Sequence, residues 1–170
     1  AIQGVVRKLK KRGNHIITSN IEHPAVKNVF KKLESEGFEV SIIPAKGNGI
    51  ISLDKLKKRI RSNTILISIM TVNNEIGTIQ PIKEIGEIAK KNNIIFHTDA
   101  VQAFGKIPID LNDLNVDLLS ASGHKIYAPK GIGLLYIKNQ GIHPQVGKYI
   151  EPICYGGTHE FGFRPSTENV

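Results

Sequence analysis

The chain has 170 residues, a size typical of one domain, and 40% of them are hydrophobic, which is enough for a core. No window reaches the run of about 18 apolar residues that a membrane helix requires, and no signal peptide is visible, so a cytoplasmic location is expected. The single cysteine, Cys154, excludes an internal disulfide framework and a zinc site built on several cysteines. The net charge of +8 is compatible with nucleic-acid binding, but the basic residues are spread over helix-like stretches without a nucleic-acid-binding motif. The composition therefore favours a solvated basic surface.

Short apolar segments alternate with amphipathic segments along the chain. The strands predicted from the apolar segments are 15–19, 38–44, 64–71, 94–99, 116–122 and 131–138. The helices predicted between them are 1–13, 23–37, 52–60 and 81–93. Ser52 is expected to cap the third helix, and Pro81 to lie in the first turn of the fourth. This alternation predicts an α/β fold with a mostly parallel sheet sandwiched by helices, followed by about thirty residues of loop.

Polar side chains interrupt the apolar runs where three of the predicted strands end. They are Asn73, Asn74, Asp99, Ser122, His124 and Lys125. Ligands of parallel sheets bind at the carboxyl ends of the strands, which meet at one edge. We therefore expect an amide, a carboxylate and a lysine to lie together there.

The combination of Asp99 and Lys125 suits pyridoxal 5'-phosphate. A carboxylate at the end of a buried strand is costly without a cationic partner, and a lysine in such a place tends toward a lowered pKa, which favours Schiff-base chemistry. An aspartate that keeps the pyridine nitrogen protonated and a lysine that holds the aldehyde are what this cofactor requires. A buried ion pair without a cofactor is the alternative, and the spacing alone does not distinguish the two.

Longer segments of the chain carry a family resemblance. In order, they resemble the NifS/IscS-type cysteine desulfurases, which belong to the class V aminotransferase branch of the fold-type I pyridoxal-phosphate enzymes. The segments are HIITSNIEHPAVKNVFKKLESEGFEV (15–40), TVNNEIGTIQPI (71–82), HTDAVQAFGKIPID (97–110), SASGHKIYAPKGIGLLYI (120–137) and GGTHEFGFRPSTENV (156–170). The resemblance implies that residues 1–170 are the central part of the large cofactor-binding domain, with the N-terminal phosphate-loop region and the C-terminal small domain absent from it.

The resemblance also implies a role for individual residues around the cofactor ring. Lys125 would form the Schiff base, and Asp99 would pair with the pyridinium nitrogen. Gln102 and Asn74 would contact the phenolic oxygen, and Asn74 would also lie near the substrate carboxylate. His23 would stack on the ring and take part in proton transfer.

Three further residues are implied to contact the cofactor phosphate. Ser122 and His124 would do so within one subunit, and Thr167 would reach the phosphate bound in the other subunit of a homodimer. The chain departs from the family pattern here, because Ser166 stands in "RPST" where the family has glycine.

The activity implied is conversion of L-cysteine to L-alanine, with the sulfur held as an enzyme-bound persulfide for iron–sulfur cluster or thio-cofactor synthesis. An iron–sulfur scaffold or another sulfur-acceptor protein would be the partner. The family's sulfur-accepting cysteine lies on a loop well beyond the lysine, whereas Cys154 follows Lys125 by only 29 residues in a segment unlike that loop. The piece is therefore expected to be inactive by itself.

Other readings of the sequence remain open. A selenocysteine lyase or another class V aminotransferase-like enzyme shares the same motifs, and a non-catalytic scaffold would need none of the chemistry. His23 in front of Pro24 is also typical of a helix cap, and a pair of asparagines such as Asn73 and Asn74 is typical of a simple turn. His97 and Asp99 share one face of a strand, but without a third ligand we expect no metal.

Overall fold

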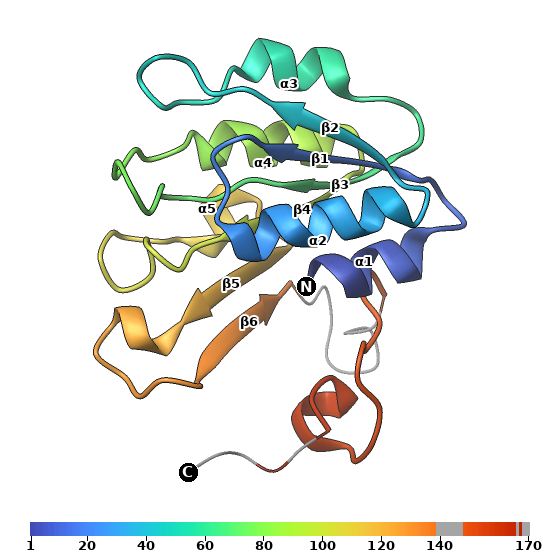
Figure 1. Cartoon of the computed structure of the whole chain (residues 1–170), viewed down its shortest axis with the longest axis vertical. Helices are drawn as coiled ribbons and strands as arrows, with labels where there is room; N and C mark the ends of the chain where they lie inside the picture. Colours follow the sequence, from blue (N-terminus) through green and yellow to red (C-terminus); the bar gives the residue numbers. More distant parts are fainter. Residues whose placement is uncertain (139–147, 166, 168–170) are drawn as a thin grey trace.

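The computed structural model describes residues 1–138, 148–165 and 167. Its centre is a six-stranded sheet with the order β2-β1-β3-β4-β5-β6 (Figure 1). The strands are β1 (His15–Ser19), β2 (Glu39–Ile43), β3 (Thr64–Ser68), β4 (Ile95–Asp99), β5 (Leu118–Ser122) and β6 (Gly133–Ile137). Neighbours from β2 to β5 pair in parallel, and β6 pairs antiparallel with β5. All six predicted strands and the mostly parallel sheet are thus confirmed.

Helices cover both faces of the sheet. They are α1 (Ile2–Leu9), α2 (Pro24–Ser35), α3 (Leu53–Arg59), α4 (Ile82–Lys91) and α5 (Leu111–Leu114), with short 3₁₀ turns η1 (Gly123–Lys125) and η2 (His159–Gly162). One buried cluster joins α1 and α2 to the sheet, and a second joins α3 and α4 to its other face (Figure 1). The sheet is therefore the middle layer of three, as a parallel sheet requires.

Most helices begin and end close to the positions predicted from the sequence, and two details differ. Ser52 caps α3, its hydroxyl accepting a hydrogen bond from the Lys55 amide at 3.4 Å. Pro81 lies one position before α4 as its N-cap residue, not inside the first turn, because its ψ of 67° is not helical. The short helix α5 was not predicted, since four residues are too few for an apolar period; Asp110 caps it by accepting from the Asn112 amide at 2.9 Å.

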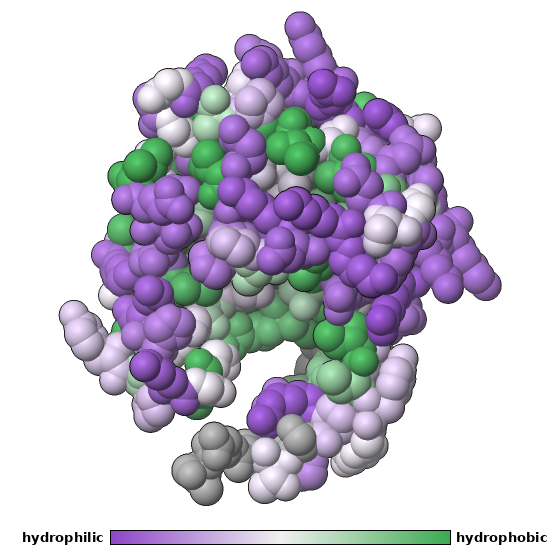
Figure 2. Space-filling view, viewed as in Figure 1, coloured by the Kyte–Doolittle hydropathy of each residue, from purple (hydrophilic) through white to green (hydrophobic). Residues whose placement is uncertain are grey.

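The segment after the sheet returns to α1. The Glu151 amide donates to the Gly4 carbonyl at 3.1 Å, and Ile150 is buried against the same helix. A Cβ on Gly4 would meet the Glu151 carbonyl oxygen at 2.4 Å, so this contact requires glycine. Figure 2 shows a hollow with an apolar surface between the helix and sheet layers and the segment 148–165. No helix in the described ranges is long and apolar enough to cross a membrane.

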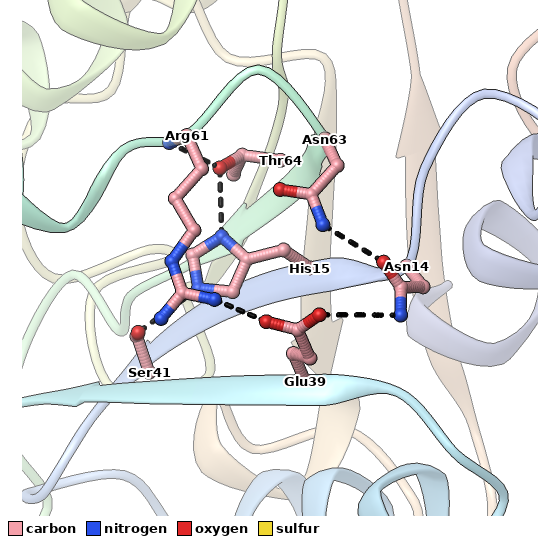
Figure 3. Close-up of polar contacts among 7 residues, drawn as sticks. All are labelled: Asn14, His15, Glu39, Ser41, Arg61, Asn63 and Thr64. Carbon is pink, nitrogen blue, oxygen red and sulfur yellow. Dashed lines mark hydrogen bonds and ion pairs between the residues drawn. The ribbon is translucent and has the colours of Figure 1, made fainter.

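A polar cluster closes the amino ends of β1, β2 and β3 (Figure 3). The buried His15 ring lies at its centre, with Nδ1 2.7 Å from Thr64 Oγ1 and Nε2 2.9 Å from Ser41 Oγ. Around it, the Arg61 guanidinium pairs with the Glu39 carboxylate. Burial, followed by the charge of Arg61, lowers the pKa of His15, so the ring is held neutral.

Candidate active site

The carboxyl ends of β1, β3, β4 and β5 surround a cavity of about 350 Å³. The loops that follow β3, β4 and β5 lie together at the left of Figure 1. The polar side chains that line the cavity are His23, Asn74, Asp99, Gln102, Ser122, His124 and Lys125. The fold thus brings together every candidate site residue except Thr167. The sequence did not indicate the apolar walls, which are Ala25, Met70, Val72 and Val101.

His23 is both a helix cap and a wall of the cavity. It is the N-cap residue of α2, and its Nδ1 accepts a hydrogen bond from the Ala25 amide at 3.2 Å. An accepting Nδ1 leaves Nε2 as the ring nitrogen that carries the proton in the neutral form. The helix-cap interpretation is therefore confirmed, and the cap fixes the ring at the cavity.

The two neighbouring asparagines, Asn73 and Asn74, have different roles in the structure. Asn73 is buried, and its Oδ1 accepts from the amides of Glu75 and Ile76, both at 3.0 Å, so it builds the turn. Asn74 is exposed at the cavity, and in the described part of the chain its side chain has no hydrogen bond. The simple-turn interpretation is right for Asn73, whereas Asn74 is left available to a ligand.

Asp99 ends β4 with its carboxylate half-buried. Its Oδ1 accepts from the Val101 amide at 2.9 Å, and no described cation forms an ion pair with it. Burial raises the pKa of Asp99, and the Val101 hydrogen bond opposes this rise. Gln102 lies one turn further on, where its Oε1 accepts from Lys106 at 2.7 Å and its amide nitrogen is free to donate elsewhere. The alternative, an ion pair between Asp99 and Lys125 without a cofactor, is not formed between these two described residues.

Lys125 ends the tight turn η1 that follows β5. A Cβ on Gly123 would meet the Ile132 side chain at 2.6 Å, so only glycine lets this turn pack on the chain entering β6. Ser122 Oγ and His124 Nδ1 lie 2.6 Å apart at the edge of the cavity. Lys125 is exposed, and its amine has no hydrogen-bond partner among the described residues.

Two residues singled out in the sequence lie outside the cavity wall. Thr167 is exposed and is not among the lining residues, so its suggested contact with a second subunit stays a prediction. Ser166, the departure from the family pattern, lies outside the described residues. Cys154 is free and exposed, and it also does not line the cavity.

His97 shares a sheet face with Asp99 but plays a structural part. Its Nδ1 lies 2.8 Å from Ser68 Oγ and its Nε2 lies 2.9 Å from Ser120 Oγ, so both ring nitrogens are engaged. Burial lowers the pKa of His97 to about 3. Among the described residues no cluster of three His, Cys, Asp or Glu could hold a metal ion.

Glu22 is a residue near the site that the sequence analysis missed. It is 2% exposed and sits directly before His23. Burial is the main reason that its pKa rises to about 7, and the charge of Asp99 adds to the rise. An acidic residue in the loop after a buried strand was the available signal.

A sequence model of the family described as aminotransferase class-V matches residues 1–167. The chain belongs to the aminotransferase class-V family. Within this class-V family, it is similar to cysteine desulfurase IscS of Methanosarcina thermophila (55% identity) and of Clostridium botulinum strain Hall (53%), each over 170 residues. It is also 53% identical over 167 residues to the mitochondrial cysteine desulfurase of Candida albicans. These matches cover 98–100% of this chain but only 40%, 41% and 33% of the relatives' own lengths.

Solved structures of similar proteins share the fold. The structure titled "SspA in complex with cysteine" matches with a TM-score of 0.90 at 45% identity, over 98% of this chain and 47% of that one. A NifS-like protein matches with a TM-score of 0.90 at 41% identity, over 99% of this chain and 45% of that one. The mostly parallel sheet with helices on both faces is therefore that of the fold-type I cysteine desulfurases.

Proposed function

We propose that the chain is the central part of the cofactor-binding domain of a pyridoxal-phosphate-dependent cysteine desulfurase, which converts L-cysteine to L-alanine. One observation carries the proposal: a lysine, a carboxylate, two amides, two histidines and a serine line a single cavity at the carboxyl ends of the strands. Relatives named as cysteine desulfurases, and a relative solved with cysteine, support this reading.

Asp99 fits the pyridine nitrogen of pyridoxal phosphate. Its carboxylate is half-buried and lacks an ion-pair partner among the described residues, and burial raises its pKa. A protonated ring nitrogen is the cation that this carboxylate lacks, and its charge would lower the pKa of Asp99 again. The residues present therefore fit the cofactor.

The remaining lining residues match the other oxygens of the cofactor. Gln102 keeps its amide nitrogen free and would donate to the phenolic oxygen together with Asn74. Ser122 and His124 would donate to the phosphate. Lys125 would hold the aldehyde carbon through its exposed amine.

When bound, pyridoxal phosphate supplies a ring that accepts the electron pair left on the substrate α-carbon after proton removal. Asp99 would make this acceptance easier by keeping the ring nitrogen protonated. Lys125 and His23 are the groups at the cavity able to move the α-proton. The helix cap occupies Nδ1 of His23, so His23 would exchange its proton through Nε2.

We do not assign the sulfur-accepting step to Cys154, since it does not line the cavity. We further propose a homodimer in which Thr167 approaches the phosphate site of the partner subunit. The sulfur would pass to an iron–sulfur scaffold or another acceptor protein, and the enzyme would act in the cytoplasm.

Cofactor trapping tests the proposal directly. Pyridoxal phosphate is added to the chain, the mixture is reduced with borohydride, and the modified lysine is mapped by peptide mass spectrometry. We expect one phosphopyridoxyl group on Lys125, which is lost in Lys125→Ala and kept in the control Lys130→Ala. Labelling scattered over surface lysines would contradict the proposal and favour a non-catalytic scaffold.

A further inference from the structure

Glu22 joins the loop after β1 to the end of β3. Its Oε1 accepts two hydrogen bonds, from Ser19 Oγ at 2.5 Å and from the Met70 amide at 3.0 Å. Ser19 is the last residue of β1, directly before this loop, but Met70 lies 48 residues away along the chain. The carboxyl group thus spans two segments that are joined only through the fold.

Asn73 makes a second link between the same two segments. Its Nδ2 donates to the Ile21 carbonyl at 2.9 Å, while its Oδ1 holds the turn that carries Asn74. Ile21 and Glu22 are adjacent, so the two links lie next to each other. Two neighbouring links restrict both the separation and the relative rotation of the segments, which one link could not do.

The residues beside these links are the ones that face the cavity. His23 follows Glu22, Asn74 follows Asn73, and Met70 itself lines the wall. The links therefore lie directly beside the imidazole and the amide that the two loops contribute to one cavity. A change of a few tenths of an ångström at either link would move a group that must meet the cofactor.

The buried setting of Glu22 is unusual for a group whose only task is folding. Its Oε2 is fully buried and has no hydrogen-bond partner among the described residues. Burial favours the neutral acid, which keeps Oε1 as an acceptor for both bonds. An apolar residue would avoid this cost but could not accept the two hydrogen bonds that Oε1 accepts from Ser19 and the Met70 amide.

We propose that Glu22 and Asn73 are positioning residues that together set the placement of His23 relative to Asn74 in the active site. The inference deepens the proposed function and rests on it for the identity of the ligand. Neither residue lines the cavity itself.

Two substitutions of Glu22 separate positioning from charge. Glu22→Gln keeps an oxygen acceptor without a carboxylate, whereas Glu22→Leu keeps the approximate volume and removes the acceptor. We expect Glu22→Leu to speed hydrogen exchange of the Met70 amide by at least about 10-fold and to shift the NMR signals of the His23 ring and the Asn74 amide. Affinity for pyridoxal phosphate should fall by about 10-fold. Glu22→Gln should restore the wild-type values.

A matched control removes a buried acceptor at the amino ends of the strands, away from the cavity. In Thr64→Val the Arg61 amide loses its 2.8 Å hydrogen bond, as the Met70 amide does in Glu22→Leu. This control should lower stability yet leave the His23 and Asn74 signals and the cofactor affinity unchanged. If Thr64→Val weakens cofactor binding as much as Glu22→Leu, or if Glu22→Leu leaves the His23 and Asn74 signals in place, the inference is wrong.

Asn73→Asp gives an independent test should Glu22→Leu fail to fold. It keeps the oxygen that accepts from Glu75 and Ile76 but loses the donor to Ile21. We expect the same His23 shift as in Glu22→Leu, and unchanged His23 signals would overturn the proposal. A wild-type chain that takes no label on Lys125 would refute the proposed function, while the NMR comparison would still decide the inference about position.

Discussion

The amino ends and the carboxyl ends of the strands, called here the amino edge and the carboxyl edge of the sheet, carry similar polar side chains that make different contacts. At the amino ends of the strands, His15, Thr64, Ser41 and the Arg61–Glu39 pair bond to one another (Figure 3). At the carboxyl ends, the side chains of Asn74 and Lys125 have no hydrogen bond in the described part of the chain, and they face a cavity.

The difference lies in what each group is bonded to, and not in its chemical type. Polar groups that satisfy each other contribute to stability, because breaking one leaves a buried partner unpaired. Polar groups left open are available to a ligand and contribute little to folding. Substitutions at the two edges should therefore affect different measurements.

The largest expected effect is at the carboxyl edge. Lys125→Ala should abolish cofactor trapping completely and change the free energy of unfolding by no more than about 0.5 kcal/mol, since the side chain is exposed and unbonded. Mass spectrometry and urea unfolding measure the two quantities on one sample. A large loss of stability would show that the Lys125 side chain makes stabilising contacts within the protein.

Lowering the pH should destabilise the fold by protonating His97, whose two ring nitrogens are hydrogen-bonded. The pKa of His97 is lowered from its ordinary 6.5 to about 3, so its contribution to stability is complete above pH 6.5 and is lost as the pH falls toward 3. Between pH 6.5 and 5 the loss should be about 2 kcal/mol. Glu22 acts in the opposite direction, since its raised pKa favours the fold at lower pH.

The variant His97→Gln isolates the histidine from Glu22, because both proteins keep the same glutamate. The free energy of unfolding of each protein is measured in urea at pH 6.5 and pH 5, and between these pH values the variant should become more stable relative to the wild type by about 2 kcal/mol, the part that His97 contributes. An unchanged difference between the two proteins would mean that His97 is not the acid-sensitive group.

The amino edge is tested by Thr64→Val. Loss of the hydroxyl leaves the Arg61 amide and His15 Nδ1 without their partner, which should cost about 2 kcal/mol of unfolding free energy. The yield of label on Lys125 should not change under conditions where the variant is folded. A reduced yield would show that the two edges are coupled.

The smallest effect is expected from the ion pair beside that cluster. Arg61 and Glu39 are each about half exposed, at 46% and 48%, so water screens their attraction. Glu39→Gln should therefore cost no more than about 0.5 kcal/mol in urea unfolding. A cost near that of Thr64→Val would mean that Glu39 is essential to the cluster.

The strands and long helices could be predicted because their aliphatic residues have a regular period. The helix α5 could not, since its four residues hold no period and only the Asp110 cap marks it. The cavity residues could be expected together because parallel strands end at one edge. Only the family resemblance singled out Asn74 and Asp99, because local spacing does not say which partners the fold brings within hydrogen-bonding distance of Asn73 or His97.

Because the Ala25 amide donates to His23 Nδ1, the orientation of the His23 ring depends on the first turn of α2 being formed. When the first turn of α2 unwinds, the ring is released, and a ligand that holds the ring must in turn hold the helix closed. Filling the cavity should thus be felt outside it, as slower fraying of α2. Because this coupling is reciprocal, the rate at which the first turn of α2 opens would indicate whether the His23 ring is in place for a ligand.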